Sequence, residues 1–228
     1  MPRLTTTISG ETITRARVEA LLADEAMLVL DDCNLSGADL SRLNLQEAVF
    51  RNCSLGETSF YAANLARTRW QRCRAGHADF ESADLVDARF ESSDLNNASW
   101  RRAKLAAASF RSCKLTGASF EEVSYLGLSF QDTLLVGADL RRMSFRKMTL
   151  TGVDFADADL AGCDFRDAVF EGGSLRGAHI KDTRFEGADL REAELDGVKL
   201  LNAKLFLGAI ISPRQAAALV RELGLHVA

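Results

Sequence analysis

Large apolar side chains recur at every fifth position along most of this chain. From Leu30 to Ile210, each fifth residue is Leu, Phe, Trp, Tyr or Ile, with Ala75 as the single exception. The register holds through 37 consecutive units without an insertion or deletion. A mostly small residue, such as Cys33 or Ala38, stands two positions before each large one, and the residue between them is often Asp, Asn or Ser. A short internal repeat of this kind predicts a solenoid.

A period of five fits neither regular helix nor flat strand. In an α-helix, with 3.6 residues per turn, a five-residue period moves the apolar residue around the axis and leaves no stripe. In a strand, side chains alternate with a period of two. The pattern instead predicts a chain that turns a corner every five residues. The large residue and the small one two places before it then point inward.

The repeats resemble a known motif. The unit at residues 38–42 reads Ala-Asp-Leu-Ser-Arg and that at 188–192 reads Ala-Asp-Leu-Arg-Glu, which is similar to the A-(D/N)-L-x-x motif of the pentapeptide-repeat family. The resemblance covers about four-fifths of the chain. It implies an all-β solenoid, a right-handed quadrilateral β-helix with four repeats, or 20 residues, per coil and about nine coils in all.

Residues 20 apart would then be stacked neighbours, and two features of the sequence agree. One inward column is largely aromatic; it contains Leu30, Phe50, Trp70, Phe90, Phe110 and Phe130. Outward charges alternate in sign at the same interval; examples are Glu81/Arg101/Glu121/Arg141, Glu47/Arg67, Asp164/Arg184 and Glu171/Arg191. We therefore expect opposite charges to pair between adjacent coils.

The two ends are expected to be caps. Residues 1–29 form an N-terminal cap with a strand near Thr5–Ser9 and a short helix from Thr14 to Asp24. Residues 30–211 form the solenoid, and 212–228 form a C-terminal helix and tail. Ser212 and Pro213 are a typical N-cap and first helical residue, and the helix is expected to end before Gly224.

Apolar residues gather near the C-terminal end, at positions expected to point outward. Either the C-terminal helix of the same chain covers them, or a second subunit does so in a symmetric homodimer. Both alternatives stay open, although similarity to topoisomerase-protecting members of the family favours the dimer. The interface candidates are Leu201, Phe206, Leu207, Ile211, Leu219, Val220 and Leu223.

Composition narrows the functional classes. The chain has 228 residues, with 28 basic and 32 acidic side chains and a net charge of −4. This mild charge is typical neither of a nucleic-acid-binding protein nor of a strong polyanion mimic. The sequence has no apolar run long enough for a membrane span, and the N-terminus lacks a secretory pattern. Five cysteines without an export signal indicate free thiols and a cytoplasmic location.

The sequence offers no constellation for catalysis, so we expect neither an enzyme nor a cofactor. Cys33, Cys53, Cys73 and Cys113 fall in one inward column, where a line of thiols cannot form a tetrahedral metal site. The three histidines are far apart in the sequence. A core filled with Leu and Phe also leaves no space for a substrate.

Similarity to the loop-free quinolone-resistance members of the family implies binding to DNA gyrase or topoisomerase IV by DNA mimicry, and hence antibiotic resistance. The acidic candidates for that contact are Asp39, Asp79, Asp139 and Asp159, which share one column, and Asp154, Asp157 and Asp164, which surround one coil. The alternating charges weigh against a continuous negative stripe. These aspartates are also suited to bonding the turn backbone.

The alternative function is a scaffold or adaptor for another protein, without DNA mimicry. Clustered basic residues and outward apolar residues could bind such a partner; they include Arg67, Arg69, Arg72, Arg74, Leu126, Leu134 and Val136. The basic groups could equally complete salt bridges between coils. Direct nucleic-acid binding is not expected, because the net charge is negative and outward aromatic residues are scarce.

Overall fold

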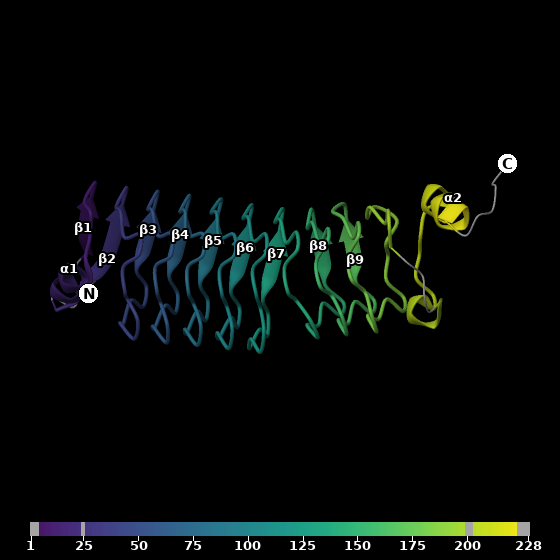
Figure 1. The fold of residues 1–228 in the computed structure, drawn as a ribbon. Helices are drawn as coiled ribbons and strands as arrows, with labels where there is room; N and C mark the ends of the chain where they lie inside the picture. The colour runs from purple at the N-terminus through teal and green to yellow at the C-terminus, as the bar shows by residue number, and fades with distance from the viewer. Residues whose placement is uncertain (1–4, 24–25, 199–202, 223–228) are drawn as a thin grey trace. The chain divides into compact units, whose positions relative to one another are not determined.

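The computed structural model describes residues 5–23, 26–198 and 203–222. The chain divides into two compact units, Met1–Leu134 and Leu135–Ala228. Both are built from short parallel strands and turns, the architecture of a parallel β-solenoid, with one helix near the start of the first unit and another near the end of the second (Figure 1).

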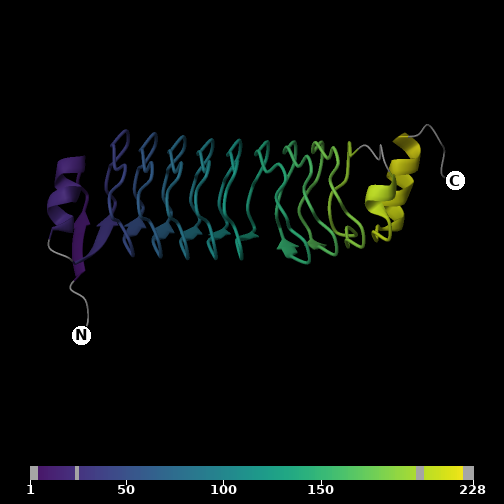
Figure 2. The ribbon, with the colours of Figure 1, turned by 90° about the horizontal axis from the view of Figure 1, so that it is seen from below.

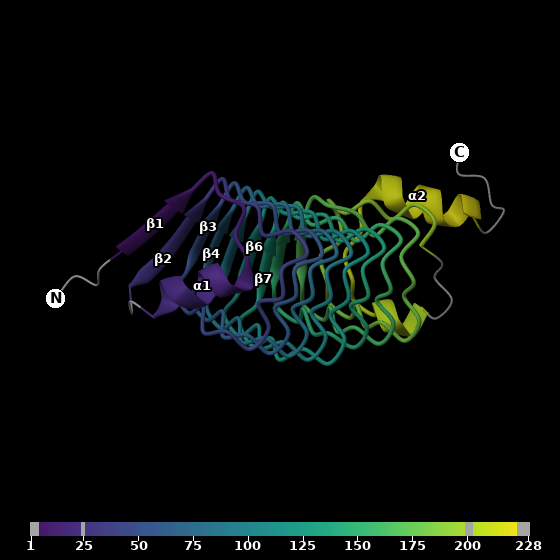
Figure 3. The same ribbon diagram turned by 60° about the vertical axis from the view of Figure 1, so that its left-hand side comes forward.

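The strands of the first unit lie side by side on one face, in sequence order (Figure 3). The strands pair in parallel, β1 with β2 at an offset of 22 residues and the later ones at an offset of 20, as in the pair Phe50↔Trp70, which confirms the predicted coil length. The elements of this unit are β1 (Thr5–Ser9), α1 (Arg15–Leu22), β2 (Met27–Asp31), β3 (Val49–Arg51), β4 (Arg69–Gln71), β5 (Arg89–Glu91), β6 (Ser109–Arg111) and β7 (Ser129–Gln131).

Three further ladders run parallel to this sheet and give the coil its four sides. Each is built from single bridges between residues 20 apart, and each bridging residue is the one that precedes an inward large residue. The ladders include the pairs Asn34–Ser54, Asp39–Ser59 and Asn44–Asn64. The predicted quadrilateral β-helix is therefore confirmed.

Stacked aromatic rings fill the core of the first unit. Trp70 is fully buried, with ring centroids 4.1 Å from Phe50 and 5.3 Å from Phe90 in the same column. In the facing column, Phe80 and Trp100 stack at 4.3 Å. Rings of the two columns meet edge to face, an arrangement that aromatic quadrupoles favour. The small inward residues, mostly alanine and cysteine, leave room for these rings.

Nearly every corner has a left-handed backbone conformation. Most residues two positions after an inward large residue have positive φ, and among the described residues 23 of these are not glycine, for example Ala107 at φ 55°. This conformation costs a residue with a Cβ atom about 1–2 kcal/mol relative to the right-handed form. The strained backbone at these corners therefore offsets part of the favourable free energy of folding.

Replacing Ala107 with glycine is expected to stabilise the protein. Glycine adopts the left-handed region without a Cβ clash. The free energy gained in this way exceeds the larger loss of backbone entropy that glycine undergoes on folding by about 0.5 kcal/mol. The preceding residue Ala106 is not among the positive-φ residues, so Ala106→Gly should instead destabilise by about 0.5–1 kcal/mol. Melting temperatures of the two variants should move in opposite directions from wild type; equal shifts would contradict this account of the corner.

The second unit repeats this architecture and then departs from the predicted register. Its elements are β8 (Thr149–Thr151), β9 (Val169–Glu171), the 3₁₀ helix η1 (Ala203–Phe206) and α2 (Pro213–Glu222). In the last coil, Asp189 bridges to Ile210, an offset of 21 residues rather than 20. The hydrogen bond from the Gly177 amide to the Asp196 carbonyl still has the offset found in the earlier coils. The chain therefore gains its one extra residue between Asp196 and Leu205.

This shift corrects three sequence predictions. Phe206, predicted to point outward, stacks on Phe185 with ring centroids 4.9 Å apart and so continues the inward column. Ile210, predicted to be the last inward residue, is 49% exposed. By the same offset, Ile211 takes the inward place beside Leu190 instead of an outward one. Because Leu205 and Phe206 are both apolar, the sequence pattern alone cannot choose between these registers.

Helices contact the coils near both ends, as the sequence predicts (Figure 2). Thr14 caps α1 by accepting a hydrogen bond from the Arg17 amide, and the helix buries Val18 and Leu21. At the start of α2, Ser212 and Gln215 form a reciprocal capping box. The Gln215 side chain also donates to the carbonyl oxygens of Leu190 and Ala193, at 2.7 and 2.6 Å. Helix α2 therefore caps coil backbone of its own chain.

Candidate partner-binding surfaces

The acidic column of the first unit is interrupted. Asp39 and Asp79 lie in one ladder but are separated by Ser59, and Ser99 follows. The Asp39 carboxylate lies 3.5 Å from the Arg15 guanidinium. Carboxylate oxygens of both aspartates accept backbone amide hydrogen bonds of 2.9 Å, from Ser41 and Glu81 respectively. The structure therefore confirms the turn-bonding role and contains no continuous negative stripe here.

In the second unit, Asp139 and Asp159 are adjacent but both meet cations. The Arg141 guanidinium lies 2.6 Å from Asp139 and 3.6 Å from Asp159. The His179 ring nitrogen Nδ1 lies 3.1 Å from the Asp159 carboxylate. The side-chain hydrogen bonds from Arg141 lower the pKa of Asp139, so this carboxylate is charged at neutral pH but largely compensated.

The negative charge of the three aspartates that surround one coil, Asp154, Asp157 and Asp164, is also partly neutralised. Asp164 accepts two hydrogen bonds from the Arg166 guanidinium, at 2.8 and 2.6 Å, and these bonds lower its pKa. Asp154 instead accepts the Ala156 amide at 2.9 Å, and Asp157 occupies an exposed corner with φ 56°. Of the seven acidic candidates, Asp79, Asp154 and Asp157 have no ion pair among the described residues.

Charge pairing differs in part from the sequence prediction. The expected bridges between coils occur at Glu47–Arg67, at 2.8 Å, and at Arg101–Glu121, at 3.2 Å. In the second unit, however, the arginines turn to acidic residues two positions away on their own coil; these pairs are Asp139–Arg141, Asp164–Arg166, Arg184–Glu186 and Asp189–Arg191. The predicted pairs Asp164/Arg184 and Glu171/Arg191 are therefore replaced. The spacing of an arginine and an acidic residue two positions apart, Asp-x-Arg in three of these pairs and Arg-x-Glu in the fourth, was the signal that could have predicted them.

Apolar side chains remain exposed at the C-terminal end of the second unit. Leu207 is 75% exposed and Ile210 is 49% exposed. Leu219 and Val220 on α2 are half-buried. The candidates Leu201 and Leu223 lie outside the described residues. Ile210 was missed by sequence reasoning, because the uninterrupted repeat gave no sign of the register shift.

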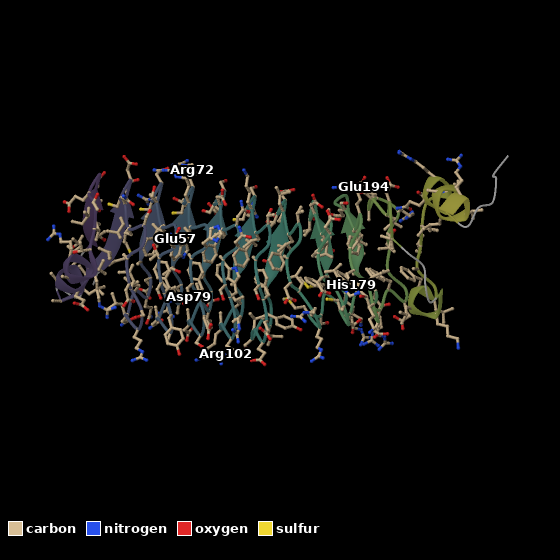
Figure 4. All side chains as sticks on the ribbon, in the orientation of Figure 1. Glu57, Arg72, Asp79, Arg102, His179 and Glu194 are labelled. Atoms are coloured by element: carbon tan, nitrogen blue, oxygen red, sulfur yellow. The ribbon has the colours of Figure 1, made fainter. Side chains whose placement is uncertain are left out.

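The cysteine side chains lie in the core of the coils. All five thiols are free and buried, and burial raises the pKa of Cys113 to about 11 and that of Cys163 to about 12. Within residues 5–23, 26–198 and 203–222, no group of three or more His, Cys, Asp or Glu side chains is arranged to hold a metal ion. No helix in the described part of the chain is long and apolar enough to span a membrane. Labelled side chains such as Asp79, Arg102 and His179 lie on the outside of the coils (Figure 4).

The fold is that of a parallel β-solenoid with a five-residue repeat. The family model for pentapeptide repeat regions matches residues 29–100 and 103–180, and the model for eight-copy pentapeptide repeats matches 83–121 and 168–205. The chain therefore belongs to the pentapeptide repeat family. No curated protein matches it.

Solved structures support the same fold. Full-length QnrB1, described as a plasmid-mediated fluoroquinolone resistance protein, is 22% identical, with a TM-score of 0.67 over 97% of this chain and 98% of that one. A trypsin-treated M102R variant of QnrB1 is 20% identical, with a TM-score of 0.55 over 99% of both chains. Identities this low support the architecture and not the activity.

Proposed function

We propose that this protein is a non-enzymatic protein-binding solenoid that binds a bacterial type II topoisomerase in the cytoplasm and protects it from fluoroquinolones. The observation that carries the proposal is the likeness to QnrB1 along nearly the whole of both chains. The similarity of the uninterrupted repeats to the loop-free topoisomerase-binding members of the family supports the same target.

The charge arrangement limits the form that DNA mimicry can take. Because Arg15, Arg141 and Arg166 compensate four of the acidic candidates, little of the negative field of duplex DNA remains at those positions. We therefore expect the shape of the coils to contribute more than net charge. Asp79, Asp154 and Asp157 are the remaining acidic contacts that a topoisomerase could use.

A direct binding measurement tests this function. Purified DNA gyrase on a biosensor surface should bind the protein with a Kd of about 1–10 µM, and linear duplex DNA should compete for the same site. A Kd above about 200 µM would remove gyrase as the target, and topoisomerase IV is then measured in the same way. If duplex DNA does not compete with the protein for gyrase, DNA mimicry is contradicted, but gyrase remains the proposed partner.

We also propose a homodimer through the C-terminal surface formed by the exposed Leu207 and Ile210 and the half-buried Leu219 and Val220. Leu207→Glu should convert a dimer to a monomer in sedimentation velocity, because it places a charge in an apolar interface without entering the core. The matched control is Leu126→Glu, since Leu126 is 88% exposed in the other unit. A wild-type protein that sediments as a monomer, or a Leu207→Glu dimer, would contradict the interface.

A further inference from the structure

The outward face of strands β3–β6 carries an excess of arginine. Its exposed guanidinium groups belong to Arg51, Arg69, Arg89 and Arg111, which together we call the arginine face. The one carboxylate on these strands is Glu91, which accepts a weak hydrogen bond of 3.4 Å from Gln71. This face is therefore cationic in a protein whose net charge is −4.

No stabilising contact in the coils accounts for the presence of arginine at positions 69 and 89. They are direct partners in the register of β4 and β5, and like charges in this position destabilise a sheet. The next residues in the same column are Val49 and Ser109, so no acid flanks the pair. Neither guanidinium has a side-chain partner among the described residues.

The other arginines of the same coil behave differently. Arg67 bonds Glu47, Arg72 bonds Asn52 and Arg74 bonds Ser54, each across one coil. Of the four clustered arginines in the sequence, only Arg69 is thus left to face solvent without a partner. Arg72 lies at the edge of the unit where β4 ends, and Arg102 lies at the opposite edge (Figure 4).

An apolar strip borders the arginine face along one corner. Ala66, Val86, Ala106 and Leu126 succeed one another at intervals of 20 residues. Backbone hydrogen bonds stack them, since the amides of Arg67, Asp87 and Ala107 donate to the carbonyls of the next three members. Leu126 is 88% exposed, and Ala66, Val86 and Ala106 are half-buried.

We propose that the arginine face and this strip together form a binding surface for an acidic protein segment that also carries apolar side chains. The arginines supply charge complementarity to carboxylates, and the strip receives aliphatic groups. A nucleic acid is the poorer fit, because its phosphates gain nothing from the apolar side chains of Leu126 and Val86. The proposal is independent of topoisomerase protection.

Fluorescence anisotropy with a labelled peptide of Glu-Glu-Leu repeats tests the proposal on the full-length protein. We expect saturable binding at low salt, weakened about tenfold by Arg69→Thr/Arg89→Thr and about threefold by Leu126→Ser. The matched control, Arg142→Thr/Arg176→Thr, removes the same charge from exposed corners of the other unit and should bind like wild type. Melting of Arg69→Thr/Arg89→Thr should occur at the wild-type temperature or above it, because a like-charge pair is removed.

Four results would overturn the proposal. One is no binding of the peptide at about 200 µM protein, and another is equal weakening by the control variant. The third is tighter binding of a labelled duplex DNA than of the peptide, lost in the same arginine variant, which would assign the surface to nucleic acid. Sedimentation at the same concentrations completes the test: self-association abolished by Arg69→Thr/Arg89→Thr would assign the surface to a second copy of the chain.

Discussion

Replacing Trp70 with alanine is expected to lower the free energy of unfolding by about 3–5 kcal/mol. Its indole is fully buried, stacks between Phe50 and Phe90, and meets Phe60 and Phe80 edge to face. Alanine would leave a cavity that the stacked coils cannot close, because the ladder hydrogen bonds fix the distance between them. Chemical denaturation should show this loss as a lower midpoint.

The second tryptophan provides an internal comparison. The Trp70 indole N–H donates to the Thr68 hydroxyl at 2.9 Å, whereas the buried indole nitrogen of Trp100 has no hydrogen-bond partner among the residues that the structure describes. Trp70→Phe should therefore destabilise by about 1–3 kcal/mol, and Trp100→Phe should cost about 1 kcal/mol less, because it removes an unsatisfied donor. Equal losses in the two variants would show that the hydrogen-bond difference does not contribute.

Replacing Gly173 with alanine is expected to cost more than about 3 kcal/mol. Gly173 has φ 79°, and a Cβ atom there would collide with the backbone of Val153, coming within 2.9 Å of its carbonyl carbon. The coils pack directly at this point, since the Ser174 amide donates to the Val153 carbonyl oxygen at 3.2 Å. A Cβ atom would have to push the two coils apart.

A variant at the neighbouring Gly172 distinguishes the effect of this clash from the cost of a left-handed backbone. Gly172 has φ 76°, but an added Cβ atom would have no neighbour within 4 Å. Gly172→Ala should therefore cost only about 0.5 kcal/mol, because the lower chain entropy of alanine offsets part of the left-handed penalty. Melting temperatures of the two variants measure the difference. Similar shifts in both would indicate that contact with Val153 is not the cause.

The repeat made the fold predictable from the sequence. Residues such as Phe50, Trp70 and Phe90, spaced by 20, can bury their rings only by stacking, so the coil length and the inward positions follow from periodicity. The capping role of Ser212 was equally visible, because it depends on local residue types, whereas Thr14, predicted as the start of a helix, proves to be its N-cap.

The surfaces were less predictable, because several partners compete for each charged side chain. Arg184 could reach Asp164 across a coil or Glu186 on its own coil, and the second pairing forms. The register shift before Phe206 was hidden for a similar reason, since Leu205 is also apolar and fits the period. The isolation of Arg69 beside Arg89 could be recognised only after the partners of Arg67, Arg72 and Arg74 were known.

A supercoiling assay with purified DNA gyrase and ciprofloxacin tests the proposed protection most directly. At a few molar equivalents of the protein over gyrase, the account predicts that supercoiling is retained at drug concentrations that otherwise stop it and that less cleaved DNA accumulates. Trp70→Ala, expected to be destabilised, should protect less at a temperature where it unfolds. Unchanged inhibition and cleavage at about 50 µM wild-type protein, with gyrase and with topoisomerase IV, would contradict the proposed function.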